Sequence, residues 1–108
     1  MVARIAEDQV VELAEMFRLM SDPTRLRIIL ACLVEPAPVG EMAERIGISG
    51  SLASHHLRLL RAARLLQAER RGRQVFYAVT DAHVRSMLGD MVDHVSEEAG
   101  EPDGTPAA

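Results

Sequence analysis

Gly47-Ile48-Ser49 is a short turn between two amphipathic segments, residues 39–46 and 50–63. Glycine often ends a helix because it adopts the left-handed backbone conformation without a steric penalty. Serine often precedes one because its hydroxyl accepts a hydrogen bond from the first helical turn. Two helices that are joined by so short a turn cross at a steep angle. The turn therefore restricts this part of the chain to a small set of folds.

Three further segments have the apolar spacing of helices. Residues 7–20 place apolar side chains every three or four positions, and Ser21-Asp22-Pro23 then supplies the cap and the first residue of a second helix. The apolar positions of this second helix are Leu26, Ile29, Leu30 and Leu33. Residues 81–98 are the third segment, with a stripe formed by Val84, Met87, Leu88, Met91, Val92 and Val95. Such a stripe predicts that the last helix packs against another surface.

A β-hairpin is predicted from two short segments, Leu66–Arg70 and Gln74–Thr80, on either side of Arg71-Gly72-Arg73. Two helices joined by a tight turn and followed by a hairpin with arginines at its tip form a winged helix-turn-helix, in which the hairpin is the wing. We therefore expect a mostly α (α+β) fold: a winged helix-turn-helix with a two-stranded β-hairpin wing and a C-terminal dimerisation helix.

The chain of 108 residues is long enough for one domain. We assign residues 1–98 to a winged-helix DNA-binding and dimerisation domain. Residues 99–108 are rich in Gly, Pro and acids, and they are predicted to be a disordered acidic tail.

The charges are segregated along the chain, although the net charge is only −4. From His55 to Arg85 the sequence has seven arginines and two acids, whereas residues 90–108 have six acids and no Lys or Arg. A local positive field attracts the phosphates of nucleic acid. The basic middle of the chain is therefore the candidate DNA-binding region, and the acidic end is not expected to touch DNA.

On a helical wheel, the helix that follows the turn has one apolar and one polar side. The apolar side holds Leu52, Ala53, Leu57, Leu59 and Leu60, and it also holds His56, which is predicted to be a packed core residue. The polar side holds Ser51, Ser54, His55, Arg58 and Arg61. Side chains of these types bond to base edges and phosphates in a major groove, and Arg71 and Arg73 on the wing are suited to phosphates or a minor groove. These seven residues are the predicted contacts to double-stranded operator DNA.

The arginines of this helix alone are equally compatible with a solvated surface. The tight turn, the arginine-tipped hairpin and the scarcity of nearby acids favour DNA binding.

Other classes of protein are disfavoured. No apolar run approaches the ~20 residues of a membrane span, and the first residues carry acids where a signal peptide is apolar, so we expect a cytoplasmic protein with no membrane partner. The single Cys32 lies in an apolar run and is predicted to be a buried hydrophobic residue. An enzyme would need an open metal position with a base, or a nucleophile with His and a carboxylate. Because no residues remain for either, we expect no catalysis and no small-molecule substrate.

Three stretches carry a family resemblance: SDPTRLRIILACL, VGEMAERIGISGSLASHHLRLLRAARLL and RRGRQVFYAV. Over about residues 8–98 the chain resembles the ArsR/SmtB family of metal-responsive repressors, with departures at Gly50 and His56. The resemblance implies a homodimer that is paired through its first and last helices. It also implies a repressor that leaves its operator when an inducer binds.

The last predicted helix carries metal donors in the pattern D-x-H, ten residues, H-x-x-E, formed by Asp81, His83, His94 and Glu97. Each pair is close enough to chelate an ion, but eleven residues of helix separate the two histidines by about 16 Å. Two antiparallel copies would bring the first pair of one chain against the second pair of the other, which gives two sites per dimer. The residues alone are equally compatible with ordinary polar groups at the rim of a dimer. The resemblance implies a metal site, because all four positions match the last-helix zinc site of the family.

Two nitrogen and two oxygen donors suit tetrahedral Zn(II) as an allosteric inducer, with Co(II) as a substitute. Residues 39–46 hold no cysteine, which disfavours the soft ions that need several thiolates. The lack of histidine after Glu98 favours zinc over nickel. Cobalt, nickel, a redox signal at Cys32 or another non-metal signal remain alternatives. Asp90, four residues before His94, remains a candidate hydrogen-bond acceptor or ligand. A zinc buffer without a regulatory role is disfavoured by the basic helix.

Overall fold

The computed structural model describes residues 4–99. Its elements, in chain order, are α1 (Glu7–Met20), α2 (Pro23–Ala31), β1 (Ala37–Pro38), α3 (Val39–Ile46), α4 (Gly50–Ala62), β2 (Leu66–Arg71), β3 (Gln74–Val79) and α5 (Ala82–Ala99). The predicted winged helix-turn-helix is confirmed. Beyond Ala99, the predicted acidic tail lies outside the described residues.

The predicted caps define where the central helices begin and end. Oδ2 of Asp22 accepts the backbone N–H of Arg25 at 3.0 Å, and this bond is the main cause that lowers the pKa of Asp22. Oγ of Ser49 accepts the backbone N–H of Leu52 at 3.0 Å at the start of α4. Gly47 ends α3 with φ 84°, in the left-handed region that favours glycine. The turn between the two helices is therefore specified locally.

The sheet has three antiparallel strands in the order β1-β3-β2. β2 and β3 pair from Leu66↔Val79 to Arg71↔Gln74, and Gly72 provides the positive φ of 63° that the two-residue turn between them needs. The sequence predicted these two strands but not β1, which pairs Ala37 with Tyr77. Two residues that include a proline give no strand signal, so β1 exists only because the chain passes the edge of β3 there.

One apolar core joins the helices to the sheet. Its buried members are Leu19, Met20, Ile28, Ile29, Cys32, Ala37, Met42, Leu57, Leu60, Leu65, Leu66, Val79 and Leu88. Helix α2 departs from the predicted stripe, because Ile28 is 0% exposed and Leu30 is 38% exposed. The reason is that α2 contacts α1, α3 and α4, so more than one of its sides is buried. The predicted stripe assumes that α2 buries only one side, and for this reason it predicts Leu30 to be buried and leaves out Ile28.

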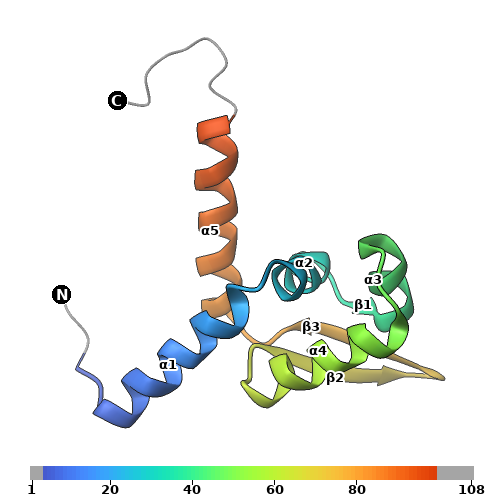
Figure 1. Cartoon of the computed structure of the whole chain (residues 1–108), viewed down its shortest axis with the longest axis horizontal. Coiled ribbons are helices and arrows are strands. Elements are labelled where there is room, and N and C mark those ends of the chain that lie inside the picture. The colour runs from blue at the N-terminus through green and yellow to red at the C-terminus, as the bar shows by residue number, and fades with distance from the viewer. Residues whose placement is uncertain (1–3, 100–108) are drawn as a thin grey trace.

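Figure 1 shows how the elements are arranged around this core. Helices α3 and α4 and the hairpin lie at one end of the molecule, and the long α5 extends away from the other end, where α1 also lies. Within residues 4–99, no helix combines the length and apolar character needed to cross a membrane.

Candidate nucleic-acid interface and metal-ligand pairs

Helix α4 turns one side to the core and the other to solvent. Ala53, Leu57 and Leu60 are at most 1% exposed and fix the orientation of the helix. The predicted DNA contacts lie on the outer side: Ser51, His55, Arg58 and Arg61 are exposed and Ser54 is half-buried. The structure thus brings the five predicted side chains of α4 to one accessible surface, and that surface is basic.

Leu52 is the residue of α4 that the helical wheel misplaced. The sequence assigned it to the apolar side, but its side chain is 42% exposed. Leu52 lies in the first turn of the helix, just after the Ser49 cap, and the adjacent Ala53 is 0% exposed, so the core covers the side of this turn that Ala53 faces. Leu52 lies about 100° around the axis from Ala53, at the edge of the apolar side, and a wheel cannot show how far around the helix the neighbouring elements reach.

His56 is partly buried, as its position on the wheel predicted. Its Nδ1 atom is buried and has no hydrogen-bond partner within the described residues. Burial is the main cause that lowers the pKa of His56, and the nearby positive charge of Arg25 adds to it. A neutral, inward-facing imidazole is a packing residue and does not extend the DNA-binding surface.

The wing presents its two predicted DNA-binding arginines differently. The guanidinium of Arg71 lies over the ring of Phe76, 4.7 Å from its centroid, and Nη2 donates to Oε1 of Glu69 at 3.2 Å. Arg73 is exposed in the turn at the tip. Arg71 is therefore held in place by a ring and a carboxylate, whereas Arg73 is presented at the end of the hairpin.

Asp81 and His83 form a close pair at the start of α5. Oδ1 of Asp81 accepts the backbone N–H groups of His83 at 3.0 Å and Val84 at 3.1 Å, so Asp81 caps the helix. The bond from Val84 is the largest cause that lowers the pKa of Asp81. Nδ1 of His83 lies 3.6 Å from Oδ1 of Asp81, and the His83 side chain is 96% exposed. Both capping bonds use Oδ1, and neither uses Oδ2 of Asp81.

His94 and Glu97 lie one helical turn apart on the far half of α5, and both are exposed. Within residues 4–99, no three His, Cys, Asp or Glu side chains of one chain are grouped so that they could hold a metal ion. Asp90, His94 and Glu97 of the single chain are not grouped in this way either. The two predicted donor pairs are thus present on one helix but are not brought together by it.

A large apolar face surrounds these pairs. Its exposed members on α1, just before it and on α5 are Ile5, Val10, Val11, Leu13, Phe17, Met91, Val92 and Val95. A groove of about 330 Å³ between α2 and α5 continues this face, with Leu26, Leu30 and Leu88 along it. Exposed large apolar side chains in such number are typical of an interaction site.

Comparison with known proteins agrees with this geometry. Residues 20–67 match the helix-turn-helix domain family. A transcriptional repressor SmtB homolog from Synechocystis is 38% identical over 90 residues, which is 83% of this chain and 68% of that protein. The chain belongs to the ArsR/SmtB family. Its place among these regulators confirms the prediction that it is not an enzyme.

Other ArsR/SmtB regulators match over similar lengths. NmtR from Mycobacterium tuberculosis is 35% identical over 83 residues, which is 77% of this chain and 69% of NmtR. The solution structure of apo-NmtR has a TM-score of 0.72 and 31% identity, and the match covers 90% of this chain and 82% of that one. A homodimeric winged helix-turn-helix DNA-binding domain from Mycobacterium bovis has a TM-score of 0.75 at 21% identity, covering 91% of this chain and 93% of that one. The last match supports the fold alone.

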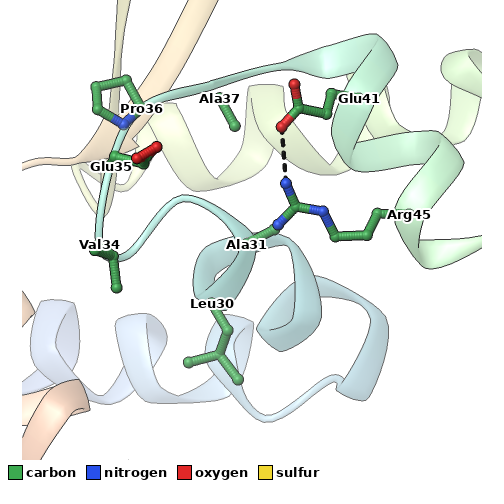
Figure 2. A pocket seen from close by; sticks show the side chains of 8 residues that line it. All are labelled: Leu30, Ala31, Val34, Glu35, Pro36, Ala37, Glu41 and Arg45. Atoms are coloured by element: carbon green, nitrogen blue, oxygen red, sulfur yellow. Dashed lines mark hydrogen bonds and ion pairs between the residues drawn. The ribbon is translucent and has the colours of Figure 1, made fainter.

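In this ArsR/SmtB chain, a second pocket lacks the donors of a site for thiophilic metals. It has a volume of about 260 Å³ and lies where α2, β1 and α3 meet (Figure 2). Nη2 of Arg45 donates to Oε1 of Glu41 at 2.7 Å, so the guanidinium neutralises this carboxylate. Among the described residues, neither cysteine nor histidine lines the pocket. The pocket therefore lacks the soft donors that thiophilic ions need.

Cys32 lies in the core, as predicted, and is 1% exposed. Burial raises the pKa of its thiol to about 11. Because the thiolate is the reactive form, the thiol of Cys32 is inert near neutral pH. The redox alternative that the sequence left open is disfavoured by this environment.

The wing of this ArsR/SmtB protein gives a prediction about DNA affinity. Arg73→Ala is expected to weaken binding to all duplexes and to reduce the slope of log K against log salt by about 0.9, because one phosphate contact is lost. Glu69→Gln is expected to strengthen binding, because Arg71 then need not leave a carboxylate to reach a phosphate. Fluorescence anisotropy with a random-sequence duplex at several salt concentrations measures both changes.

Arg18→Ala is the matched control for the wing, since Arg18 lies on α1 in an ion pair with Glu15. Its salt slope should equal that of the unaltered protein. If Arg73→Ala also leaves the slope unchanged, the tip of the wing does not contact phosphates.

Proposed function

We propose that this protein is a homodimeric metal-sensing repressor, which leaves its operator DNA when Zn(II) binds between the two α5 helices. The observation that carries the proposal is the division of four donors into two pairs on one helix. Asp81 and His83 are in contact at its start, His94 and Glu97 lie on its far half, and about 11 residues of helical rise keep the pairs roughly 16 Å apart.

A second copy of the chain supplies the two further donors that each pair needs for a four-coordinate site. If two α5 helices pair in antiparallel fashion, the Asp81 pair of one protomer meets the His94 pair of its partner, and the two-fold symmetry generates the site twice. The exposed apolar face of α1 and α5 supports this pairing, because the dimer would cover it.

The donor set fits the proposed ion. Two imidazole nitrogens and two carboxylate oxygens make a closed tetrahedral shell, which suits Zn(II) and allows Co(II) as a spectroscopic substitute. Oδ1 of Asp81 is committed to the N-cap, so the cap fixes the carboxylate while Oδ2 serves as the ligand. When bound, the ion would supply a cross-link between the two protomers.

Such a cross-link would act on DNA through the dimer, because α5 extends away from the body that carries α3 and α4 (Figure 1). The spacing and tilt of the two α4 helices decide whether both reach successive major grooves. Helix α5 contacts β3, and Nε of Arg85 donates to the carbonyl of Leu33 at 3.4 Å. A change in α5 pairing is therefore passed to the body that carries α4. Repression of this kind takes place in the cytoplasm, where the DNA lies.

The test is DNA affinity with and without zinc. A duplex selected from a random pool by the metal-free protein is expected to bind about 5 to 150 times more weakly after zinc loading, which corresponds to a coupling of about 1–3 kcal/mol. Equal affinity of the two forms would contradict the sensor function. His94→Ala should bind the duplex normally and lose the response to zinc.

The same titration with Ni(II) and Co(II) shows which ion weakens DNA binding most. A larger effect of nickel than of zinc would overturn the choice of metal and leave the dimeric site in place.

A further inference from the structure

Most exposed apolar residues of the described chain belong to one surface. Eight of them lie on α1, just before it, or on α5, and Leu30 lines the groove next to α5. Val34, in the connection after α2, and Leu52, on α4, are the two that lie elsewhere, with exposures of 90% and 42%. Dimerisation accounts for the common surface but not for Leu52.

Leu52 lies within the DNA-binding surface. Its neighbour Ser51 and His55, three residues further along the helix, are both exposed, and its own backbone N–H is bonded to the Ser49 cap. Among the large apolar residues of α4, Leu57, Leu59 and Leu60 pack in or against the core, whereas Leu52 does not. Figure 1 shows the start of α4 next to α3, at the end of the helix farther from α5. Leu52 is therefore an apolar group at the first turn of the helix that enters the major groove.

Thymine is the base that offers an apolar group in the major groove, its C5-methyl, while the other base edges present hydrogen-bond donors and acceptors. We propose that Leu52 is a specificity-determining residue that contacts the C5-methyl group of one thymine in each half-site. The proposal rests on the proposed DNA-binding function. Ser51 and His55 flank Leu52 on the same surface, so hydrogen bonds to neighbouring bases would set the register in which Leu52 meets the methyl group.

The experiment selects binding sites from a random duplex pool with the unaltered protein and with Leu52→Ala. One thymine per half-site is expected to be preferred by the unaltered protein and to lose that preference in Leu52→Ala. In the selected duplex, changing this thymine to deoxyuridine removes only the methyl group. The change is expected to weaken binding of the unaltered protein about fourfold per half-site, because this is the effect of removing one methyl group from water. The affinity of Leu52→Ala should not change.

Two controls separate the contact from folding and from general DNA affinity. Leu52→Ala should unfold at nearly the same temperature as the unaltered protein, because its side chain is not part of the buried core. Val34→Ala should select the same sites as the unaltered protein. A duplex with 5-methylcytosine in place of this thymine should bind the unaltered protein more tightly than a duplex with cytosine there, because the methyl group is restored.

The outcomes distinguish the two proposals. If the unaltered protein enriches no sequence, the DNA-binding function fails and this contact fails with it. If it enriches a site that Leu52→Ala enriches with the same base preferences, or if deoxyuridine has no effect at any thymine, DNA binding stands and the role of Leu52 is overturned.

Discussion

Mixing two ligand-deficient variants is expected to restore one tight metal site per heterodimer. The first variant is Asp81→Asn with His83→Ala, in which asparagine keeps the helix cap, and the second is His94→Ala with Glu97→Gln. Each homodimer has only half-sites and should bind Co(II) weakly. In the heterodimer one site has no ligands left, but the other combines the intact pair of each chain. The intense visible absorption of tetrahedral Co(II) should therefore return at one equivalent per heterodimer.

The apolar face is unaltered in both variants, so the subunits should still exchange, and a mass tag on one chain counts the heterodimers. Heterodimers that form without recovering tight binding would show that the ligands do not come from two chains. Asp93→Asn removes one surface charge from the same half of α5 and leaves both donor pairs intact, so this control variant should bind cobalt normally.

A charge in the apolar face is expected to separate the dimer. Val95→Asp places a carboxylate on the exposed part of α5, where the side chain is 60% exposed and lines the groove beside α2. The monomer should keep its fold, because an exposed substitution disturbs no core contact. Affinity for a palindromic duplex is expected to fall by about 10² to 10⁴, because the two half-sites can no longer be bound by one linked pair of subunits. Analytical ultracentrifugation and a DNA titration measure the two effects.

Val34→Asp is the matched control, since Val34 is 90% exposed but belongs to the connection after α2 and not to α1 or α5. It should remain dimeric and bind DNA as the unaltered protein does. A Val95→Asp protein that sediments as a dimer would show that α5 is not the pairing surface.

The sequence by itself determined the elements whose signals are local. Gly47 and Ser49 mark the turn between α3 and α4, and Gly72 marks the turn of the wing, because a positive φ or a side-chain cap is a property of a few neighbouring residues. The order of charges along the chain and the two donor pairs of α5 are likewise visible in the sequence. The DNA contacts and the metal ligands drawn from them stay predictions.

The tertiary structure decided which side chains are buried and which segments pair, because both depend on elements that are distant in the sequence. Ile28 is buried and Leu30 exposed because α2 packs against several helices. β1 pairs with β3 because a distant strand edge is there to receive it. Leu52 is exposed although the adjacent Ala53 is buried, because the neighbouring elements cover only one side of the first turn of α4. An apolar residue that the wheel assigned to packing therefore lies on the surface predicted to meet DNA. Periodicity gives the direction of a side chain around its own helix, and the position of the neighbouring elements, set by contacts far apart in sequence, decides whether that direction is buried.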